Sequence, residues 1–444
     1  MAKVKKDKIA IEDILLPIDE HPYEIPQNWC WVKHNGVLDI SGGSQPAKSY
    51  FISEPTEGYI KLYQTRDYGD NPVPVYIPEK YATKTTLEGD ILLARYGGSL
   101  GKVFRAHEGA YNVALAKVIK LYPDLIDDEY LYKYYFTQFY QDFCVKASKG
   151  RSAQAGFNRD DMNNIPFPLP PLAEQRRIVE QIESLFTKLD EAKEKAQEVI
   201  DGYEARNAAV YNAAFSGRLT AQWRKDNYKG NKWETKRFDE VANIKSNLVD
   251  PSAYLEYPHI APDNIEKRTG ILLDYHTIAE DGVKSGKHRF YAGQILYSKI
   301  RPYLSKVVMV DFDGLCSADM YPIEAKENTK YLLYYMLSDM FLEQASSAGS
   351  RSVLPKINQK ELSAIKVRIT SAEEQEEVVR ILDYILPMMQ QVRDKAIQVV
   401  DNIDIMKKSI LAKAFRGELG TNIPEDESAI ELLKIILDKG DVNG

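Results

Sequence analysis

The chain has 444 residues, enough for two to four domains, and its 44% hydrophobic and 28% charged residues are typical of folded proteins. Three scattered cysteines without a CxxC pair exclude a disulfide framework and predict buried thiols in a reducing compartment. No apolar leader or long apolar run is present, so we expect a cytoplasmic protein that is neither exported nor membrane-spanning. The net charge of −7 gives DNA binding no support, although residues 371–444 alone carry 9 Lys/Arg against 15 Asp/Glu, a net of −6.

The most informative feature of the sequence is an internal repeat, in which the second half of the chain resembles the first. At an offset of 200, the matches are Arg151-Ser152, Asn158, Ile165, Glu174-Gln175 and Val179 with Arg351-Ser352, Asn358, Ile365, Glu374-Gln375 and Val379. Further upstream the offset is 204, with Trp29, Val37, Ile40 and Gly89 matching Trp233, Val241, Ile244 and Gly293. A unit of half the chain is too long for a solenoid repeat. The sequence therefore predicts two copies of a whole domain.

Each copy is predicted to have a mixed front part and a helical back part. In chain order, the predicted parts are 1–169 (first front part, with an N-terminal extension at 1–22), 170–230 (first long helix and connector), 231–370 (second front part), 371–423 (second long helix) and 424–444 (acidic amphipathic tail). Short β-like runs separated by turn residues fill the front parts, and each contains an aromatic amphipathic stretch, 130–143 or 331–341, that predicts a helix. The tail resembles residues 9–16 in pattern, and both segments are expected to dock on the helical pair or on a partner.

The back parts carry an apolar seam with alternating spacings of four and three residues. It runs through Ile178, Ile182, Leu185, Leu189, Ala192, Ala196, Val199, Tyr203, Arg206, Val210 and Ala213, and then through Val378, Leu382, Ile385, Met389, Val392, Ala396, Val399, Ile403, Met406, Ile410 and Lys413. A period of 3.5 over five heptads predicts a coiled coil. Gly217 and Gly417 should end these helices, and Pro387 should kink or locally unwind the second. The first helix spans about 40 residues, or roughly 60 Å.

The order globule, helix, globule, helix constrains the fold. If the two helices pair with each other, the second must return along the first. The predicted fold class is therefore α+β, with two mixed α/β domains at opposite ends of a pair of long antiparallel coiled-coil helices, related as a pseudo-twofold internal repeat. The alternative is that each seam pairs with a partner helix. Internal pairing is favoured because Ala192 and Ala196 suit a close two-helix approach.

Catalytic and metal-binding motifs are nearly absent. The segment 97–103 resembles a phosphate loop, but it is one residue short between its outer glycines and Val103 stands where Ser or Thr must bind magnesium. A turn between two strands is the better interpretation. The six histidines lack metal-ligand spacing, and the Asn/Asp-Pro-Pro-Tyr/Phe motif of adenine methyltransferases is missing. The remaining catalytic candidate is Glu324-Ala325-Lys326, which has the spelling of a nuclease metal site but is a common charged triplet.

Binding residues are better represented in the front parts, where cations mix with amides, hydroxyls and aromatic side chains. Such side chains contact phosphates and base edges, although each taken singly is more often an ordinary surface residue. The candidate DNA-binding residues are Lys61, Gln64, Arg66, Arg95, Tyr96, Ser99, Lys102, Arg151 and Ser152 in copy one, and His259, Asn264, Lys267, Arg268, Lys287, Arg289, Lys299, Arg301, Tyr303, Arg351 and Ser352 in copy two. The repeated Arg151 and Arg351 stand beside glycines, so they either contact DNA from a loop or cap the aromatic helix.

These residues resemble the specificity subunits of Type I restriction-modification systems, over nearly the whole chain. The most specific passage is 165–178, read IPFPLPPLAEQRRI, and further similar passages are GDIL at 89–92, SKIRPYL at 298–304, AFSGRL at 214–219 and AFRGEL at 414–419. The start of the second helix at Ser371-Ala372 departs from the pattern, because it lacks the Pro-Pro-Leu of the first.

The resemblance implies two target recognition domains, each binding one half of a split, asymmetric DNA site, with the helices as a ruler between them. It implies no catalytic residues, metal or cofactor in this chain. S-adenosylmethionine, ATP and magnesium would belong to partners, namely two adenine-methylating modification subunits and, in some complexes, two restriction subunits. The alternative hypotheses are a bivalent coiled-coil scaffold for proteins and a fused methyltransferase or nuclease fragment.

Overall fold

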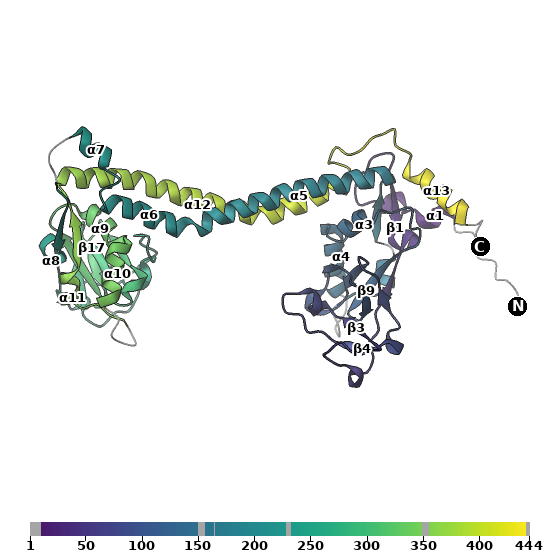
Figure 1. Ribbon diagram of the computed structural model, residues 1–444, viewed down its shortest axis with the longest axis horizontal. Helices are drawn as coiled ribbons and strands as arrows, with labels where there is room; N and C mark the ends of the chain where they lie inside the picture. The colour runs from purple at the N-terminus through teal and green to yellow at the C-terminus, as the bar shows by residue number, and fades with distance from the viewer. Residues whose placement is uncertain (1–9, 150–155, 164, 228–231, 349–354, 441–444) are drawn as a thin grey trace. The chain divides into compact units, whose positions relative to one another are not determined.

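The computed structural model describes residues 10–149, 156–163, 165–227, 232–348 and 355–440. It divides into two compact units, each built from both halves of the sequence. Unit 1 comprises Met1–Glu194 and Val399–Gly444, and unit 2 comprises Lys195–Gln398. Figure 1 labels several helices and strands of each unit.

Unit 1 contains two four-stranded sheets and a two-stranded ribbon. Its strands are β1 (Cys30–Lys33), β2 (Leu38–Gly42), β3 (Tyr59–Tyr63), β4 (Tyr76–Pro78), β5 (Thr85–Thr86), β6 (Ile91–Ala94), β7 (Val103–Arg105), β8 (Gly109–Tyr111), β9 (Leu115–Lys120) and β10 (Pro166–Leu169). Its helices are α1 (Ile11–Ile14), α2 (His34–Val37), α3 (Asp128–Tyr134), α4 (Gln138–Lys149) and α13 (Ala429–Gly440), together with most of α5 (Leu172–Asp201) and the end of α12 (Ala372–Ala414). The sheet orders are β2-β9-β6-β7 and β4-β3-β8-β5, and β1 pairs with β10.

Unit 2 repeats this plan. Its strands are β11 (Glu234–Arg237), β12 (Ala242–Ile244), β13 (Leu248–Val249), β14 (Pro258–Ile260), β15 (His276–Thr277), β16 (Lys287–Phe290), β17 (Ile295–Ser298), β18 (Val307–Met309), β19 (Gly314–Cys316), β20 (Met320–Ala325) and β21 (Lys366–Ile369). Its complete helices are α6 (Tyr203–Phe215), α7 (Ala221–Asp226), α8 (Phe238–Val241), α9 (Thr329–Leu337), α10 (Asp339–Ala348) and α11 (Gln359–Ala364). The sheet orders are β12-β20-β17-β18 and β13-β16-β19-β14-β15, and β11 pairs with β21.

The two units share one plan, with one more strand in the second sheet of unit 2, and this confirms the internal repeat. The sheet β2-β9-β6-β7 of unit 1 corresponds strand for strand to β12-β20-β17-β18 of unit 2. In the second sheet, the parallel pair β3·β8 corresponds to the parallel pair β14·β19. Single-turn 3-10 helices fill several connections, namely η1 (Ile18–Glu20), η2 (Lys48–Tyr50), η3 (Thr65–Tyr68), η4 (Glu79–Tyr81), η5 (Gly97–Ser99), η6 (Asp160–Met162), η7 (Pro251–Ala253), η8 (Pro262–Asn264) and η9 (Pro302–Leu304).

The aromatic helices form as predicted, each broken once at a Thr or Ser. In unit 1, α3 and α4 are separated near Thr137, whose hydroxyl donates to the Tyr134 carbonyl at 2.7 Å. The same break in unit 2 falls at Ser338, which donates to the Tyr335 carbonyl at 2.6 Å. These rings face the core, and the hydroxyl of Tyr130 donates to the Pro168 carbonyl of β10 at 2.9 Å. The aromatic helices thereby hold the ribbons that lead into the long helices.

A buried glutamate ties unit 1 together at the start of α5. Glu174 is fully buried and accepts hydrogen bonds from Trp29 Nε1 at 2.7 Å and from Asn422 Nδ2 at 2.8 Å. Asn422 follows the end of α12, where Gly417 (φ 74°) contacts Trp29 and lies so close to Pro26 that a Cβ atom would come within 2.4 Å of the proline ring. The front part of copy one is therefore joined to the end of the long helix of copy two.

Unit 2 has the same glutamate node, meaning a buried glutamate that joins a front part to the end of the other copy's long helix. Here the front part belongs to copy two and the helix end to copy one. Glu374, also fully buried, accepts from Trp233 Nε1 at 3.2 Å and from Thr370 Oγ1 at 2.7 Å. Thr220 and Arg224, which follow the end of α6, complete its partners. The junction before α12 keeps the bond from tryptophan to glutamate, but Thr370, which stands where copy one has Pro170, adds a side-chain hydrogen bond to the glutamate.

The long helices pack together in antiparallel register, as predicted. In unit 1, Lys407 of α12 donates to Asp190 of α5 at 2.5 Å, and its ammonium lies 5.1 Å from the ring of Phe186. In unit 2, Tyr203 of α6 donates to Gln390 of α12 at 2.5 Å. Residue numbers fall along one helix as they rise along the other, so internal pairing holds within each unit. In Figure 1, α5 lies beside the yellow end of α12.

The prediction of one uninterrupted first helix is wrong, because it breaks at Gly202. The 30-residue α5 ends at Asp201 and the 13-residue α6 begins at Tyr203. Arg206, predicted as a seam residue, instead turns back and donates to the carbonyl oxygens of Val199 and Glu198 at 3.0 and 3.2 Å. A side chain that satisfies carbonyls near the break lowers the cost of interrupting the helix.

Pro387 does not unwind α12, which continues as 43 residues from Ala372 to Ala414. Proline removes one amide donor, but α12 is anchored on both sides of Pro387 by buried residues such as Leu382 and Ala396. The local unwinding expected from the sequence is therefore absent.

The tail helix forms as predicted and docks on unit 1. Ala429 and Leu433 of α13 are fully buried and belong to the same core cluster as Ile14 of α1. The amide of Ala429 donates to the Asn28 carbonyl at 2.9 Å, which closes this corner of the unit. The two terminal amphipathic segments thus pack against each other.

Candidate nucleic-acid interface

Some of the candidate DNA-binding residues lie in one turn of each unit, between the third and fourth strands of the first sheet. The turn in unit 1, Arg95–Lys102, joins β6 to β7, and the turn in unit 2, Lys299–Lys306, joins β17 to β18. The amide of Arg95 donates to the Ala114 carbonyl at 2.9 Å, and the amide of Lys299 donates to the Asp319 carbonyl at the same distance. A cation therefore stands at the same point of both frames.

A segment from far along the chain pairs with each turn. Tyr96 bridges to Gly156 in unit 1, and Ile300 bridges to Lys356 in unit 2. In the sequence, Gly156 and Lys356 come shortly after Arg151-Ser152 and Arg351-Ser352. Those four candidates lie outside the described residues, so their DNA contacts stay predictions.

In the turn of unit 1, Arg95 is half-buried and its guanidinium lies 4.7 Å from the Tyr96 ring. It also occupies the space beside Gly42, where a Cβ atom would come within 2.3 Å of its Nη1. Ser99 is half-exposed and Lys102 is exposed. The segment 97–102 forms the turn between two strands, which confirms that interpretation over a phosphate loop.

The remaining candidates of copy one lie at the end of β3. The Lys61 ammonium lies 4.5 Å from the Tyr63 ring, and Arg66 is exposed in η3. Gln64 caps η3, and its own amide donates to Asp67 at 2.7 Å. Asn112, at the end of the adjacent β8, donates its amide to the Tyr63 carbonyl at 3.0 Å. The parallel strands thus bring these polar groups to one sheet edge.

An aromatic stack beside β3 was missed in the sequence. The Tyr68 ring stacks on Phe104 at a centroid distance of 4.5 Å and on His107 at 6.0 Å. These residues are 36 to 39 positions apart, so only strand pairing reveals the stack. Stacked rings with nearby cations are typical of nucleic-acid surfaces and of ordinary cores alike.

In the turn of unit 2, Arg301 and Tyr303 are exposed while Lys299 is half-buried. The Lys299 ammonium donates to the Ala318 carbonyl and lies 5.3 Å from the Tyr321 ring. Burial lowers the pKa of Lys299, and the neighbouring Asp319 opposes that shift. The exposed groups of this turn are therefore Arg301 and Tyr303.

Three candidates of copy two are engaged by the protein itself. His259 is 8% exposed and its Nδ1 lies 2.7 Å from Asp281, and Lys287 is 7% exposed with its ammonium donating to Ser285 Oγ at 2.6 Å. Asn264 accepts from the Ala261 amide at 2.8 Å, which caps η8. These contacts support a framework role, and DNA contact by these residues stays a prediction.

Arg289 is surrounded by tyrosines. Its guanidinium lies 4.8 Å from the Tyr291 ring, 5.4 Å from Tyr254 and 6.0 Å from Tyr257. Tyr291 is 43% exposed, so part of this cluster faces solvent. The sequence singled out the arginine but not its rings, because the tyrosines come from separate segments.

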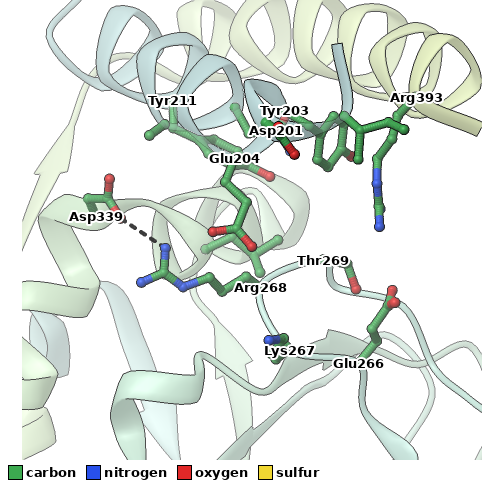
Figure 2. A pocket seen from close by; sticks show the side chains of 14 residues that line it. Asp201, Tyr203, Glu204, Tyr211, Glu266, Lys267, Arg268, Thr269, Asp339 and Arg393 are labelled. Atoms are coloured by element: carbon green, nitrogen blue, oxygen red, sulfur yellow. Dashed lines mark ion pairs between the residues drawn. The ribbon is translucent and has the colours of Figure 1, made fainter. Parts of the chain in front are cut away.

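Lys267 and Arg268 line a cleft of about 380 Å³ between a loop of the second front part and α6. Arg268 points toward Asp339, with a nitrogen–oxygen distance of 3.9 Å, and the carboxylate of Glu204 lies beside it (Figure 2). Asp201 and Glu266 add negative charge to the lining. This mixed-charge cleft gives Arg268 protein partners, so its contact with DNA also stays a prediction.

The long helices carry an apolar groove in unit 2. It measures about 430 Å³ and is lined almost wholly by apolar atoms of Val199, Tyr203, Arg206, Tyr384, Ile385, Met388, Met389 and Val392. Tyr384, Met388 and Val392 are 67%, 48% and 53% exposed. Apolar residues at spacings of four on an exposed helix face are typical of a helix-binding surface.

The described ranges contain no group of three or more His, Cys, Asp or Glu side chains able to hold a metal ion. Glu324 of the E-x-K triplet pairs with Lys245 at 2.6 Å, which lowers the pKa of its carboxyl. Every helix in them is too short or too polar to cross a lipid bilayer.

Known proteins resemble this chain over both halves of the repeat. The model of the Type I restriction modification DNA specificity domain matches residues 26–200 and again 230–399. The specificity subunit of the Type I restriction enzyme EcoDI of Escherichia coli is 37% identical over 352 residues, which cover 74% of this chain and 78% of that protein. That of EcoKI, from strain K12, is 22% identical over 431 residues, covering 89% and 90%.

The crystal structure of the HsdS subunit from Thermoanaerobacter tengcongensis has the same fold, with a TM-score of 0.64 at 19% identity. That match covers 90% of this chain and 100% of the other. Both halves of the repeat match one family model, and a relative above 30% identity spans most of the chain. The chain therefore belongs to the Type I restriction-modification specificity subunits.

Proposed function

We propose that this chain reads a bipartite, asymmetric DNA sequence for a Type I restriction-modification complex, one half-site with each front part. One observation carries the proposal: the two units share a frame but present different side chains at the equivalent turns. Unit 1 presents Arg95, Tyr96 and a glycine-rich tip, whereas unit 2 presents Lys299, Arg301 and Tyr303. A common frame with different tips reads two different half-sites.

Within the proposed complex, this chain is the non-catalytic subunit. S-adenosylmethionine, ATP and magnesium are assigned to modification and restriction subunits. In support, the repeated acidic residues Glu174 and Glu374 both accept buried structural hydrogen bonds, and Glu324 forms an ion pair with a lysine. Such carboxylates hold the frame.

Two modification subunits are proposed to dock along the long helices, with restriction subunits joining in some complexes. The apolar groove around Met388 in unit 2 supports this assignment, because exposed apolar stripes on helices bury favourably against a partner. Partner subunits also supply phosphate contacts that an acidic chain lacks.

The test is to co-express the chain with its modification subunit and map methylated adenines in the cellular DNA. We expect one split motif, methylated in both halves, and no methylation by the purified chain alone. Exchanging residues 231–370 for those of a relative should change one half of the motif and leave the other. Methyl transfer by the isolated chain, or a change in both halves, would contradict the proposal.

A further inference from the structure

Left-handed backbone conformations at residues other than glycine concentrate in unit 2. Among the described residues, three non-glycine residues have positive φ: Arg268 (63°), Arg301 (47°) and Ser305 (45°). Two of them bracket η9 at the tip of the β17–β18 turn, and the third donates its amide to the Ser305 carbonyl at 3.2 Å. An L side chain crowds the backbone in this conformation.

Copy one meets the same backbone requirement with glycine. At the offset of 204, Arg301 corresponds to Gly97 (φ 68°) and Ser305 corresponds to Gly101 (φ 81°). The two turns are also bonded alike, because Leu100 donates its amide to the Gly97 carbonyl at 3.0 Å and Leu304 donates to the Arg301 carbonyl at 2.9 Å. The left-handed positions are therefore a property of the frame, and copy two carries side chains where glycine is the unstrained choice.

Ser305 has a structural reason to be there. It is 1% exposed, and its hydroxyl donates to the Met336 carbonyl of α9 at 3.4 Å. Arg268 likewise pairs with Asp339.

Arg301 has no such reason. It is exposed, and no hydrogen bond or ion pair engages its guanidinium within the part of the chain that the structure describes. Its backbone is nevertheless anchored, since its amide donates to the Pro355 carbonyl at 2.8 Å. A rigid, strained turn thus presents an unoccupied guanidinium to solvent.

The surroundings of Arg301 suit an anionic ligand. Lys299 and Lys356 lie on the two segments that bridge beside it, and Tyr303 of the same turn is 47% exposed. Asp319 is the acidic neighbour, and it is paired with Lys356 at 2.9 Å. Strained residues held by a rigid frame are characteristic of functional positions.

Resting on the proposed function, we infer that Arg301 makes a bidentate contact with paired acceptors on the DNA half-site read by unit 2. The planar guanidinium matches such acceptor pairs, either the O6 and N7 atoms of guanine or two phosphate oxygens. A lysine would supply charge alone, so the presence of arginine where copy one has glycine points to a role for the forked guanidinium. Copy one must read its half-site without this contact.

The test uses the full chain in complex with its modification subunit. The probe is a DNA duplex carrying the motif mapped with the wild-type complex. Arg301→Gly and Arg301→Ala should both weaken binding about 10- to 100-fold. Arg301→Lys should restore at most a small part of the loss, because it keeps the charge but not the fork.

The stability of the same variants separates a binding role from a structural one. Both small variants lack the arginine side chain, so their difference reports the left-handed backbone strain less the unfolded-state entropy that alanine removes, and Arg301→Gly should melt about 2–4 °C above Arg301→Ala. Ser305→Gly, which relaxes the other end of the turn, should bind DNA like the wild type. A base contact predicts a loss confined to duplexes with the intact half-site, whereas a phosphate contact predicts a uniform loss and a salt slope reduced by about one.

Two failures are distinguishable. If the wild-type complex itself shows no sequence preference, the proposed function is wrong. If the wild-type complex is specific and Arg301→Gly binds the motif with unchanged affinity, the inference about Arg301 is wrong while the proposed function stands.

Discussion

The two front parts are one frame with two different tips. Three features of the frame recur in both units: a cation at the end of the third strand, two left-handed positions in the following turn, and a buried glutamate at the start of each long helix. The left-handed positions hold glycine in unit 1 and Arg301 and Ser305 in unit 2. The tips differ in charge, in aromatic content and in backbone strain. The comparison teaches that the positions constrained by packing are repeated, while those facing solvent carry the difference between the copies.

The largest expected difference lies in the two glutamate nodes. Glu374→Gln should lower the unfolding free energy of unit 2 by about 3 kcal/mol, because it leaves the Arg224 guanidinium beside a neutral group in a buried site. Glu174→Gln should cost about 1 kcal/mol in unit 1, because its Trp29 and Asn422 partners are neutral. Urea unfolding followed by tryptophan fluorescence measures both, and equal costs would show that the nodes are energetically alike.

The apolar groove around Met388 should also distinguish the two copies, in how strongly each contributes to assembly with the modification subunit. Met388→Glu should weaken assembly with the modification subunit at least about 10-fold, because it places a charge in an apolar contact, with little effect on the fold of this exposed position. The matched control is Lys188→Glu, the equivalent position in copy one, which is already polar and exposed. Gel filtration and calorimetry of the mixed subunits provide the measurement. Equal losses from both substitutions would place the contact outside this groove.

The unfolding free energy of unit 1 should also depend on pH through the buried Glu174. Burial raises the pKa of Glu174 above its ordinary value of 4.5, and hydrogen bonds from Trp29 and the charge of Arg177 only partly oppose this. A raised folded-state pKa contributes stability that is fully present below 4.5 and is lost as the pH rises through the folded-state pKa. The cost of Glu174→Gln, measured by urea unfolding across that window, should therefore fall as the pH rises. A cost that grew with pH would contradict the assignment.

The smallest effect concerns the glycine tip of unit 1. Gly97→Ala should cost about 1 kcal/mol, because φ is 68° and the new Cβ meets no atom within 4 Å, so the cost is the left-handed strain less the unfolded-state entropy that alanine removes. Gly98→Ala is the matched control, since it also meets no atom but lacks positive φ, and it should be neutral or slightly stabilising. Thermal unfolding of the two variants decides. Equal midpoints would show that the turn relaxes freely, which would also weaken the strain argument at Arg301.

Several features were predictable from the sequence because they depend on local periodicity or self-similarity. The repeat, the aromatic helices and the turn at 97–102 follow from residue spacing, and the glycines at 217 and 417 end their helices with φ of 78° and 74°. The heptad seam is correct only in part, because its predicted members Val392, Val399 and Met406 are 53%, 43% and 48% exposed. The candidate cations Arg95 and Lys299 were identified singly, and the structure shows that they occupy one equivalent position.

The sequence by itself thus determined the internal repeat and the antiparallel direction of the long helices. Only the tertiary structure decided which half of the chain completes each unit, as when Gly417 closes on Trp29 across almost 400 residues. It also decided that the helix breaks where Arg206 can satisfy the carbonyls, that His259 and Lys287 are held inside the fold, and that Arg301 remains free within the described residues. Local spacing specifies a helix or a turn, but burial and partner choice depend on which distant atoms arrive beside a side chain, and spacing alone carries no record of them.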